Sequence, residues 1–125
     1  MGNKKEKRKF YFDPRGNATH NLFIKSDKFI EISTITLKNI FEENNLKKCS
    51  LLKIDCEGAE YEIFESATSD LLKKIKIICM EYHPNGNPLD IKLKLEKNGF
   101  EVLIKKSTIQ GIGYIYAQNK YGFGL

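Results

Sequence analysis

Short apolar runs alternate with helically spaced segments from residue 29 onward, which is the pattern of an α/β domain. The run at 29–35 is rich in β-branched residues and predicts an extended segment. Apolar residues at 37, 40 and 41 then follow helical spacing. Thr36 is placed to cap this helix, and Asn44 and Asn45 are placed to end it.

Two further apolar runs, 50–56 and 75–82, predict buried parallel strands. A helix is expected after each strand. The first helix is expected at 59–67, and the second begins after Asn87 and ends at Gly99.

Segments 101–105 and 114–118 predict two more strands. The connection at 106–113 is too short for a crossover helix, so this pair should be antiparallel. Its G-x-G, at residues 111–113, precedes a strand and is better suited to a hairpin turn than to phosphate binding. The fold class is therefore α/β, with parallel strands that end in an antiparallel hairpin.

The charge of the chain is concentrated at its start. The 125 residues have a formal net charge of +5, and residues 1–15 contain six basic and two acidic side chains. The rest is nearly neutral, which argues against nucleic acid as a partner of the folded part. We divide the chain into a basic, weakly ordered segment at 1–32, a domain at 33–120 and a tail at 121–125. A basic arm that binds RNA or an anionic surface, or a segment that docks through Phe10, Tyr11 and Phe12, are alternatives for the start.

The sequence also indicates whether the protein spans a membrane and in which redox compartment it resides. No apolar stretch approaches 18 residues, so we expect no membrane span. The three cysteines are odd in number and lack metal-ligand spacing, which favours reduced thiols in the cytoplasm.

Ionisable residues gather where the two parallel strands end. Because the carboxyl ends of parallel strands lie at one edge of a sheet, these residues are the candidate site. They are Lys53, Asp55, Glu57 and Glu60 after the first strand, and Glu81 and His83 after the second.

Each candidate has a structural alternative. Lys53 and Asp55 alternate onto one face, where Asp55 or Glu57 could pair with the lysine. Glu57 and Glu60 could simply complement the dipole of the helix that follows. His83 could be a general base, or a surface histidine that opens a proline turn.

A divalent metal at this edge is chemically possible. Oxygen and nitrogen donors from Asp55, Glu57, Glu81 and His83 would suit Mg²⁺ or Mn²⁺. The sequence cannot show that these side chains converge, and we assign no metal ligand from it.

Residues 51–60, with the sequence LLKIDCEGAE, resemble the signature of the FkbM family of S-adenosylmethionine-dependent methyltransferases. The flanking pieces agree: the I-T-L at 35–37, the E-Y-H-P at 81–84, and the leucine-rich segment with G-F at 95–100. The resemblance covers roughly residues 33–119.

The resemblance implies the C-terminal half of a class I, Rossmann-like methyltransferase sheet of seven strands, the last of them antiparallel. It implies S-adenosylmethionine as cofactor and O-methylation of a hydroxyl on a small molecule or saccharide. It places Asp55, with Lys53 and Glu57, at the acceptor end of the cleft. His83 or Asp55 would then deprotonate the hydroxyl, Lys53 would hold and polarise the carboxylates, and Glu60 and Glu81 would shape the site.

The cofactor-binding half of such enzymes comes first and consists of a strand, a glycine-rich turn and an acidic residue. Residues 1–33 contain no such unit, so we expect a truncated copy, one half of a split protein, or a fragment that self-associates. The first remaining strand would expose an edge, which favours a homodimer or a partner chain that supplies the missing half. The alternative function is a non-catalytic remnant that acts through self-association or a partner.

Overall fold

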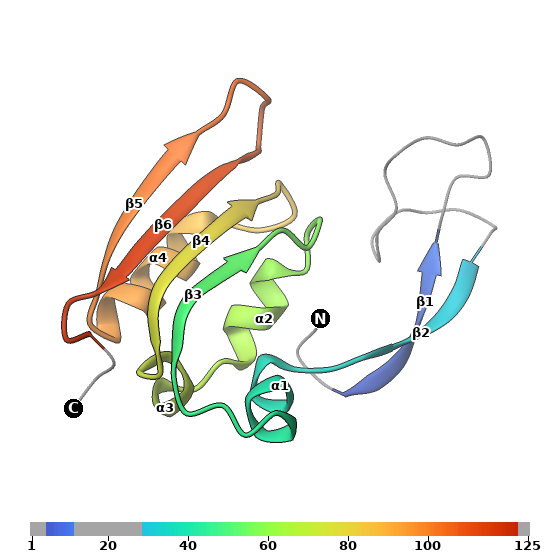
Figure 1. Ribbon diagram of the computed structural model, residues 1–125. Helices are drawn as coiled ribbons and strands as arrows, with labels where there is room; N and C mark the ends of the chain where they lie inside the picture. The colour runs from blue at the N-terminus through green and yellow to red at the C-terminus, as the bar shows by residue number, and fades with distance from the viewer. Residues whose placement is uncertain (1–4, 12–28, 123–125) are drawn as a thin grey trace.

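The structure, a computed structural model, describes residues 5–11 and 29–122 (Figure 1). Two strands, β1 (Glu6–Tyr11) and β2 (Phe29–Thr34), pair in antiparallel fashion with Glu6 opposite Thr34. The extended segment expected at 29–35 is confirmed by β2, whereas the sequence pattern did not predict β1. The weak order expected for 1–32 remains a prediction, since 1–4 and 12–28 lie outside the described residues.

A second sheet of four strands carries the main part of the domain. Its strands are β3 (Cys49–Ile54), β4 (Ile75–Tyr82), β5 (Phe100–Lys106) and β6 (Gly113–Asn119). Their order is β3-β4-β6-β5, with β3 and β4 parallel and both other pairings antiparallel. The parallel pair and the antiparallel hairpin are thus confirmed. Two of the three pairings are antiparallel, because the hairpin joins β4 through its second strand.

Within the described residues four helices accompany the sheet, and their ends follow local sequence signals. They are α1 (Leu37–Glu43), α2 (Glu60–Ser66), α3 (Ser69–Leu72) and α4 (Pro88–Lys97). Thr36 caps α1 in a capping box with Asn39, and Asn87 caps α4. Gly99 follows α4 at φ +88°, a conformation that favours glycine at a helix end. The short helix α3 was not predicted, because the segment after Ala67 carries too little helical periodicity.

The helices lie on one face of the four-stranded sheet, as Figure 1 shows. The core between sheet and helices is built from buried apolar side chains, which include Ile54, Ile63, Phe64, Leu72, Ile75, Ile78, Leu95, Phe100 and Ile115. Alternation along β6 is strict, with buried and exposed residues taking turns. Within the described residues, no helix is both long and apolar enough to cross a membrane.

The opposite face of the sheet is open in the described part of the chain. Leu51 on β3 is 59 % exposed, and Leu103 on β5 is 62 % exposed. The expectation that 50–56 is a fully buried strand is therefore wrong. β3 is the edge of its sheet, and among its residues only Ile54 is fully buried.

Candidate functional site

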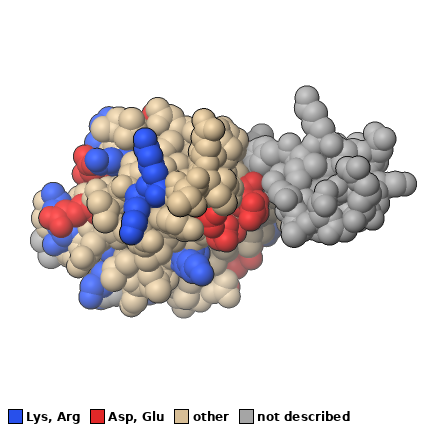
Figure 2. Space-filling view, turned by 90° about the horizontal axis from the view of Figure 1, so that it is seen from above, with Lys and Arg blue, Asp and Glu red and all other residues tan. Residues whose placement is uncertain are grey.

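The candidate site lies where the parallel strands β3 and β4 end. In the register of this pair, Lys53 is opposite Cys79 and Ile54 is opposite Met80. Asp55 directly follows Ile54, and Glu81 directly follows Met80. The expectation that the two strand ends are neighbours is therefore confirmed. Figure 2, seen from this end of the sheet, shows acidic side chains gathered in one patch.

A tight turn between β3 and α2 positions the first half of the site. Glu57 has φ +49° and Gly58 has φ +110°, both in the left-handed region. The amide nitrogen of Asn85 donates to the carbonyl of Gly58 at 2.6 Å, which ties this turn to the loop after β4. The turn lets the chain reverse into α2 within a few residues, so that Glu57 and Glu60 both point back toward the strand ends.

The best-defined contact of the site joins Glu60 to His83. The Glu60 side chain, in the first turn of α2, is 0 % exposed, and His83 is 7 % exposed. One carboxylate oxygen of Glu60 accepts the backbone N–H of Gly58 at 3.0 Å. The other oxygen lies 2.7 Å from Nδ1 of His83. The alternative that His83 is a surface histidine is wrong, because the ring is buried against this carboxylate.

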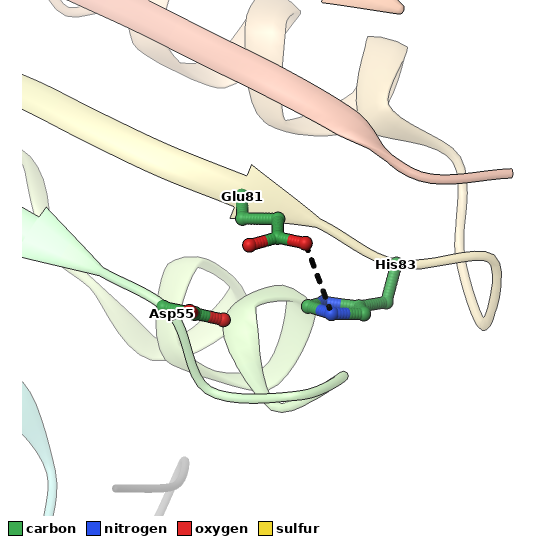
Figure 3. A group of neighbouring side chains, drawn as sticks. All are labelled: Asp55, Glu81 and His83. Atoms are coloured by element: carbon green, nitrogen blue, oxygen red, sulfur yellow. Dashed lines mark ion pairs between the residues drawn. The ribbon is translucent and has the colours of Figure 1, made fainter. Parts of the chain in front are cut away.

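The second ring nitrogen of His83 faces the rest of the cluster. Nε2 lies 3.3 Å from a carboxylate oxygen of Glu57 and 3.9 Å from one of Glu81. Asp55 completes the group, since one ligand atom each of Asp55, Glu81 and His83 lies within 4.8 Å of the others. Figure 3 shows these three side chains, with the Glu81–His83 pair dashed. The convergence that the sequence could not show is therefore present.

The ion pair expected between Lys53 and the carboxylates is not formed. It is exposed on β3, and among the described residues it forms no ion pair with Asp55 or Glu57. Because the ammonium is exposed and solvated, pairing with the carboxylates would stabilise the fold only weakly. Lys53 and Asp55 do line one groove of about 230 Å³, which Glu81 and two tyrosines, Tyr114 and Tyr116, also line.

Tyr61 and Asn85 support the site, and sequence reasoning missed both. The hydroxyl of Tyr61 donates to the backbone carbonyl of His83 at 2.7 Å. Burial, followed by the nearby Glu60 carboxylate, raises the pKa of Tyr61 to about 12, so this donor keeps its proton at neutral pH. In the sequence, only their positions could have pointed to these two residues, since Tyr61 follows Glu60 and Asn85 lies two residues after His83.

The environment of Cys56 does not favour a nucleophilic thiolate. It lies between Asp55 and Glu57, and burial raises the pKa of its thiol, with Glu60 and Asp55 acting in the same direction. A thiol in such a setting stays protonated and weakly reactive. The chemistry of the site therefore belongs to the carboxylates and the imidazole.

The arrangement supports two kinds of chemistry. An ionised Glu60 only accepts hydrogen bonds, so it fixes the Nδ1–H tautomer of His83 and leaves Nε2 to accept a proton. This is how a carboxylate orients a histidine base. The same oxygens and nitrogen are also donors that could hold a divalent cation.

The sequence resembles those of known methyltransferases. The sequence model of one family, the methyltransferase FkbM domain, matches residues 3–102. The match begins well before the region on which the sequence resemblance rests, so the basic start of the chain lies inside it. It stops before the end of β5.

One curated relative is the hexuronic acid methyltransferase AglP of Haloferax volcanii, which is 26 % identical over 90 residues. The alignment covers 72 % of this chain and 36 % of the relative, so the chain spans about a third of that protein's length. The search of solved structures found no match.

Proposed function

The chain belongs to the FkbM methyltransferase domain family, and we propose that it contributes the acceptor side of a methyl-transfer site. The observation that carries this proposal is the convergence of Asp55, Glu81 and His83, with Glu60 holding the imidazole. Such a cluster at the carboxyl ends of parallel strands lies where open α/β sheets bind their ligands. The last strand, β6, runs antiparallel to both its neighbours, which supports the partial class I methyltransferase fold.

We propose a hydroxyl of a small molecule or saccharide as the methyl acceptor. The relative's name, which specifies a hexuronic acid, favours a saccharide. Before or during transfer the hydroxyl must lose its proton, and Nε2 of His83 or the carboxylate of Asp55 is placed to accept it. Glu60 would act through His83 as a positioning residue.

S-adenosylmethionine is proposed as methyl donor on family membership alone. Within 5–11 and 29–122, two parallel strands lead into a helix beside the site, β3 into α2 and β4 into α4. Each connection contains one glycine, and both helices have an acidic first turn, with Glu60 and Glu62 on α2 and Asp90 on α4. An acidic first turn repels the donor's carboxylate. The described residues therefore do not by themselves fit the donor, and we derive no step through it.

The test is transfer of a labelled methyl group from S-adenosylmethionine to uronate-containing oligosaccharides, with calorimetry of donor binding alongside. We expect Asp55→Asn and His83→Asn to abolish transfer, while Asp70→Asn, an exposed carboxylate on α3, leaves it unchanged. The assay is run on this chain alone and with a partner polypeptide that supplies a glycine-rich strand–turn–helix unit. Absence of donor binding and transfer in both conditions would refute the proposal for this chain.

A second candidate, a non-catalytic protein that self-associates, rests on the open face of the sheet. Leu51, Leu103, Tyr114 and Tyr116 are exposed there, and β3 has no neighbour on its outer edge within the described residues. An uncovered apolar face and a free edge favour pairing with another chain. Gel filtration tests this: a dimer that persists in Asp55→Asn and dissociates in Leu51→Lys supports it, and a monomer in both contradicts it.

We also propose a reducing, cytoplasmic setting. Cys49, Cys56 and Cys79 are all free thiols. Free thiols persist where glutathione and thioredoxin keep the compartment reducing.

A further inference from the structure

The charged groups nearest to the Nε2 atom of His83 are carboxylates. One oxygen of Glu60 accepts from Gly58 N–H, and the other lies 2.7 Å from Nδ1 of His83, where a carboxylate can only accept. The proton of a neutral His83 therefore sits on Nδ1, and Nε2 carries a lone pair. The side chain of His83 is nine-tenths buried, so bulk water does not freely solvate this atom.

The groups that Nε2 faces are also acceptors. Its neighbours are a Glu57 oxygen at 3.3 Å and a Glu81 oxygen at 3.9 Å. Carboxylates and a lone pair at these distances repel one another unless positive charge lies between them. No lysine or arginine among the described residues makes an ion pair with Glu57, Glu81 or Asp55. A proton on the ring or a bound cation would place positive charge between these groups.

The geometry is close to what a cation requires. Donor atoms of Asp55, Glu81 and His83 already lie within 4.8 Å of one another. Carboxylate and imidazole ligands bound at about 2.1 Å lie about 3.0 Å apart when adjacent and about 4.2 Å apart when opposite, so a pair of these atoms needs to close by at most about 2 Å. Asp55 and Glu81 are partly or fully exposed, which leaves them free to make that movement.

We propose that Asp55, Glu81 and His83 bind one divalent cation of the Mn²⁺ or Mg²⁺ class. Two carboxylates with one imidazole are the donors that such hard to borderline ions accept. Glu60 would be the outer carboxylate that orients the ligating histidine, a partnership that accompanies most histidine ligands. Glu57, 3.3 Å from Nε2, is placed to supply a further oxygen.

Cation binding requires neither a methyl donor nor an acceptor, so it stands apart from the proposed function. It also bears on the choice of base. A cation on Nε2 occupies the lone pair of His83, which leaves the second oxygen of Asp55 as the group able to take the proton. In the proposed reaction the cation would hold the acceptor oxygen and lower the pKa of its hydroxyl.

The experiment uses Mn²⁺ alone, titrated into the full chain while the spectrum of free Mn²⁺ is followed by electron paramagnetic resonance. We expect one ion per chain. Asp55→Asn and Glu81→Gln should each weaken binding at least tenfold, and Glu60→Gln should weaken it about 10- to 100-fold. The matched controls are Glu65→Gln and Glu101→Gln, exposed carboxylates away from the cluster, which should bind as the wild type does. Circular dichroism checks that each variant is folded.

A second readout locates the ion. Bound Mn²⁺ should broaden the ring resonances of His83 in the wild type more than in Asp55→Asn at the same Mn²⁺ concentration. The proposal is overturned if the wild type does not bind Mn²⁺ at millimolar concentration, or if Asp55→Asn and Glu81→Gln bind as tightly as the controls. It is equally overturned if Mn²⁺ leaves the His83 ring signals unchanged, because a protonated ring then supplies the charge.

Discussion

Replacing Glu60 tests the contact on which the site depends. Its carboxylate has no exposed surface and accepts from Gly58 N–H at 3.0 Å and from His83 Nδ1 at 2.7 Å. Glu60→Ala leaves both donors buried without a partner. Glu60→Gln keeps the shape of the side chain, and its amide oxygen can still accept from Gly58. The amide nitrogen, however, now donates to Nδ1, so His83 has to move its proton to Nε2.

The magnitudes follow from these two hydrogen bonds. A buried donor that loses its partner costs about 1–3 kcal/mol. Because Glu60→Ala leaves two such donors, we expect it to lower the free energy of unfolding by about 2–6 kcal/mol. Glu60→Gln loses charge assistance but no hydrogen bond, and should lower it by about 1–2 kcal/mol. The control Glu65→Gln, exposed on the same helix, should stay within about 0.5 kcal/mol of the wild type.

Urea unfolding followed by circular dichroism measures the three variants, and nitrogen-15 NMR of the ring reports the tautomer of His83. In the ion-free wild type the proton should be on Nδ1, and in Glu60→Gln it should be on Nε2. The reasoning is refuted if Glu60→Ala is no less stable than Glu65→Gln, or if the tautomer is the same in wild type and Glu60→Gln.

Three further predictions concern the surroundings of the site. Thr36→Ala removes the cap of α1 and should lower the free energy of unfolding by about 1 kcal/mol in urea, with Thr36→Ser as a control that retains most of it. Gly99→Ala should cost about 1–3 kcal/mol, because φ is +88° and the new Cβ would lie 2.9 Å from the Tyr121 ring. Gly122→Ala, at φ +68° with no atom within 4 Å, should cost less, and equal losses would contradict the steric argument. The pKa of Tyr61 is raised from 10.0 to about 12, first by burial and then by the Glu60 carboxylate. The folded state therefore holds this proton more tightly than the unfolded chain does. The resulting stabilisation is complete below about pH 10 and is lost as the pH rises to about 12. Unfolding across this range should show a smaller loss in Tyr61→Phe, and an equal loss would contradict the assignment.

Local signals accounted for most of the elements. Thr36 and Asn87 cap helices because a side-chain oxygen next to a run of unpaired N–H groups has a defined use, and Gly99 ends α4 for an equally local reason. The run at 75–82 matches β4 residue for residue. The burial of β3 was misjudged, because a continuous apolar run looks the same at an edge and in the centre of a sheet.

The site was predicted in its residues but not in its contacts. The sequence predicted that Asp55, Glu81 and His83 lie close together, because the ends of parallel strands are adjacent. In the structure, one ligand atom of each residue lies within 4.8 Å of the others. Lys53 was expected to pair with the carboxylates, yet it remains exposed. Whether a long, flexible side chain at a sheet surface forms an ion pair depends on its solvation, and residue spacing in the sequence does not predict this.

The sequence by itself determined the alternation of strands and helices, the hairpin, the family and the position of the ionisable cluster, because each depends on short-range periodicity or a contiguous motif. Only the tertiary structure decided that β6 lies between β4 and β5, that one face of the sheet is uncovered by the described residues, and that Glu60 is the buried partner of His83. These features depend on which surfaces the chain buries against each other. That selection is made by packing between residues distant in sequence, such as Glu60 and His83, and local patterns carry no record of it.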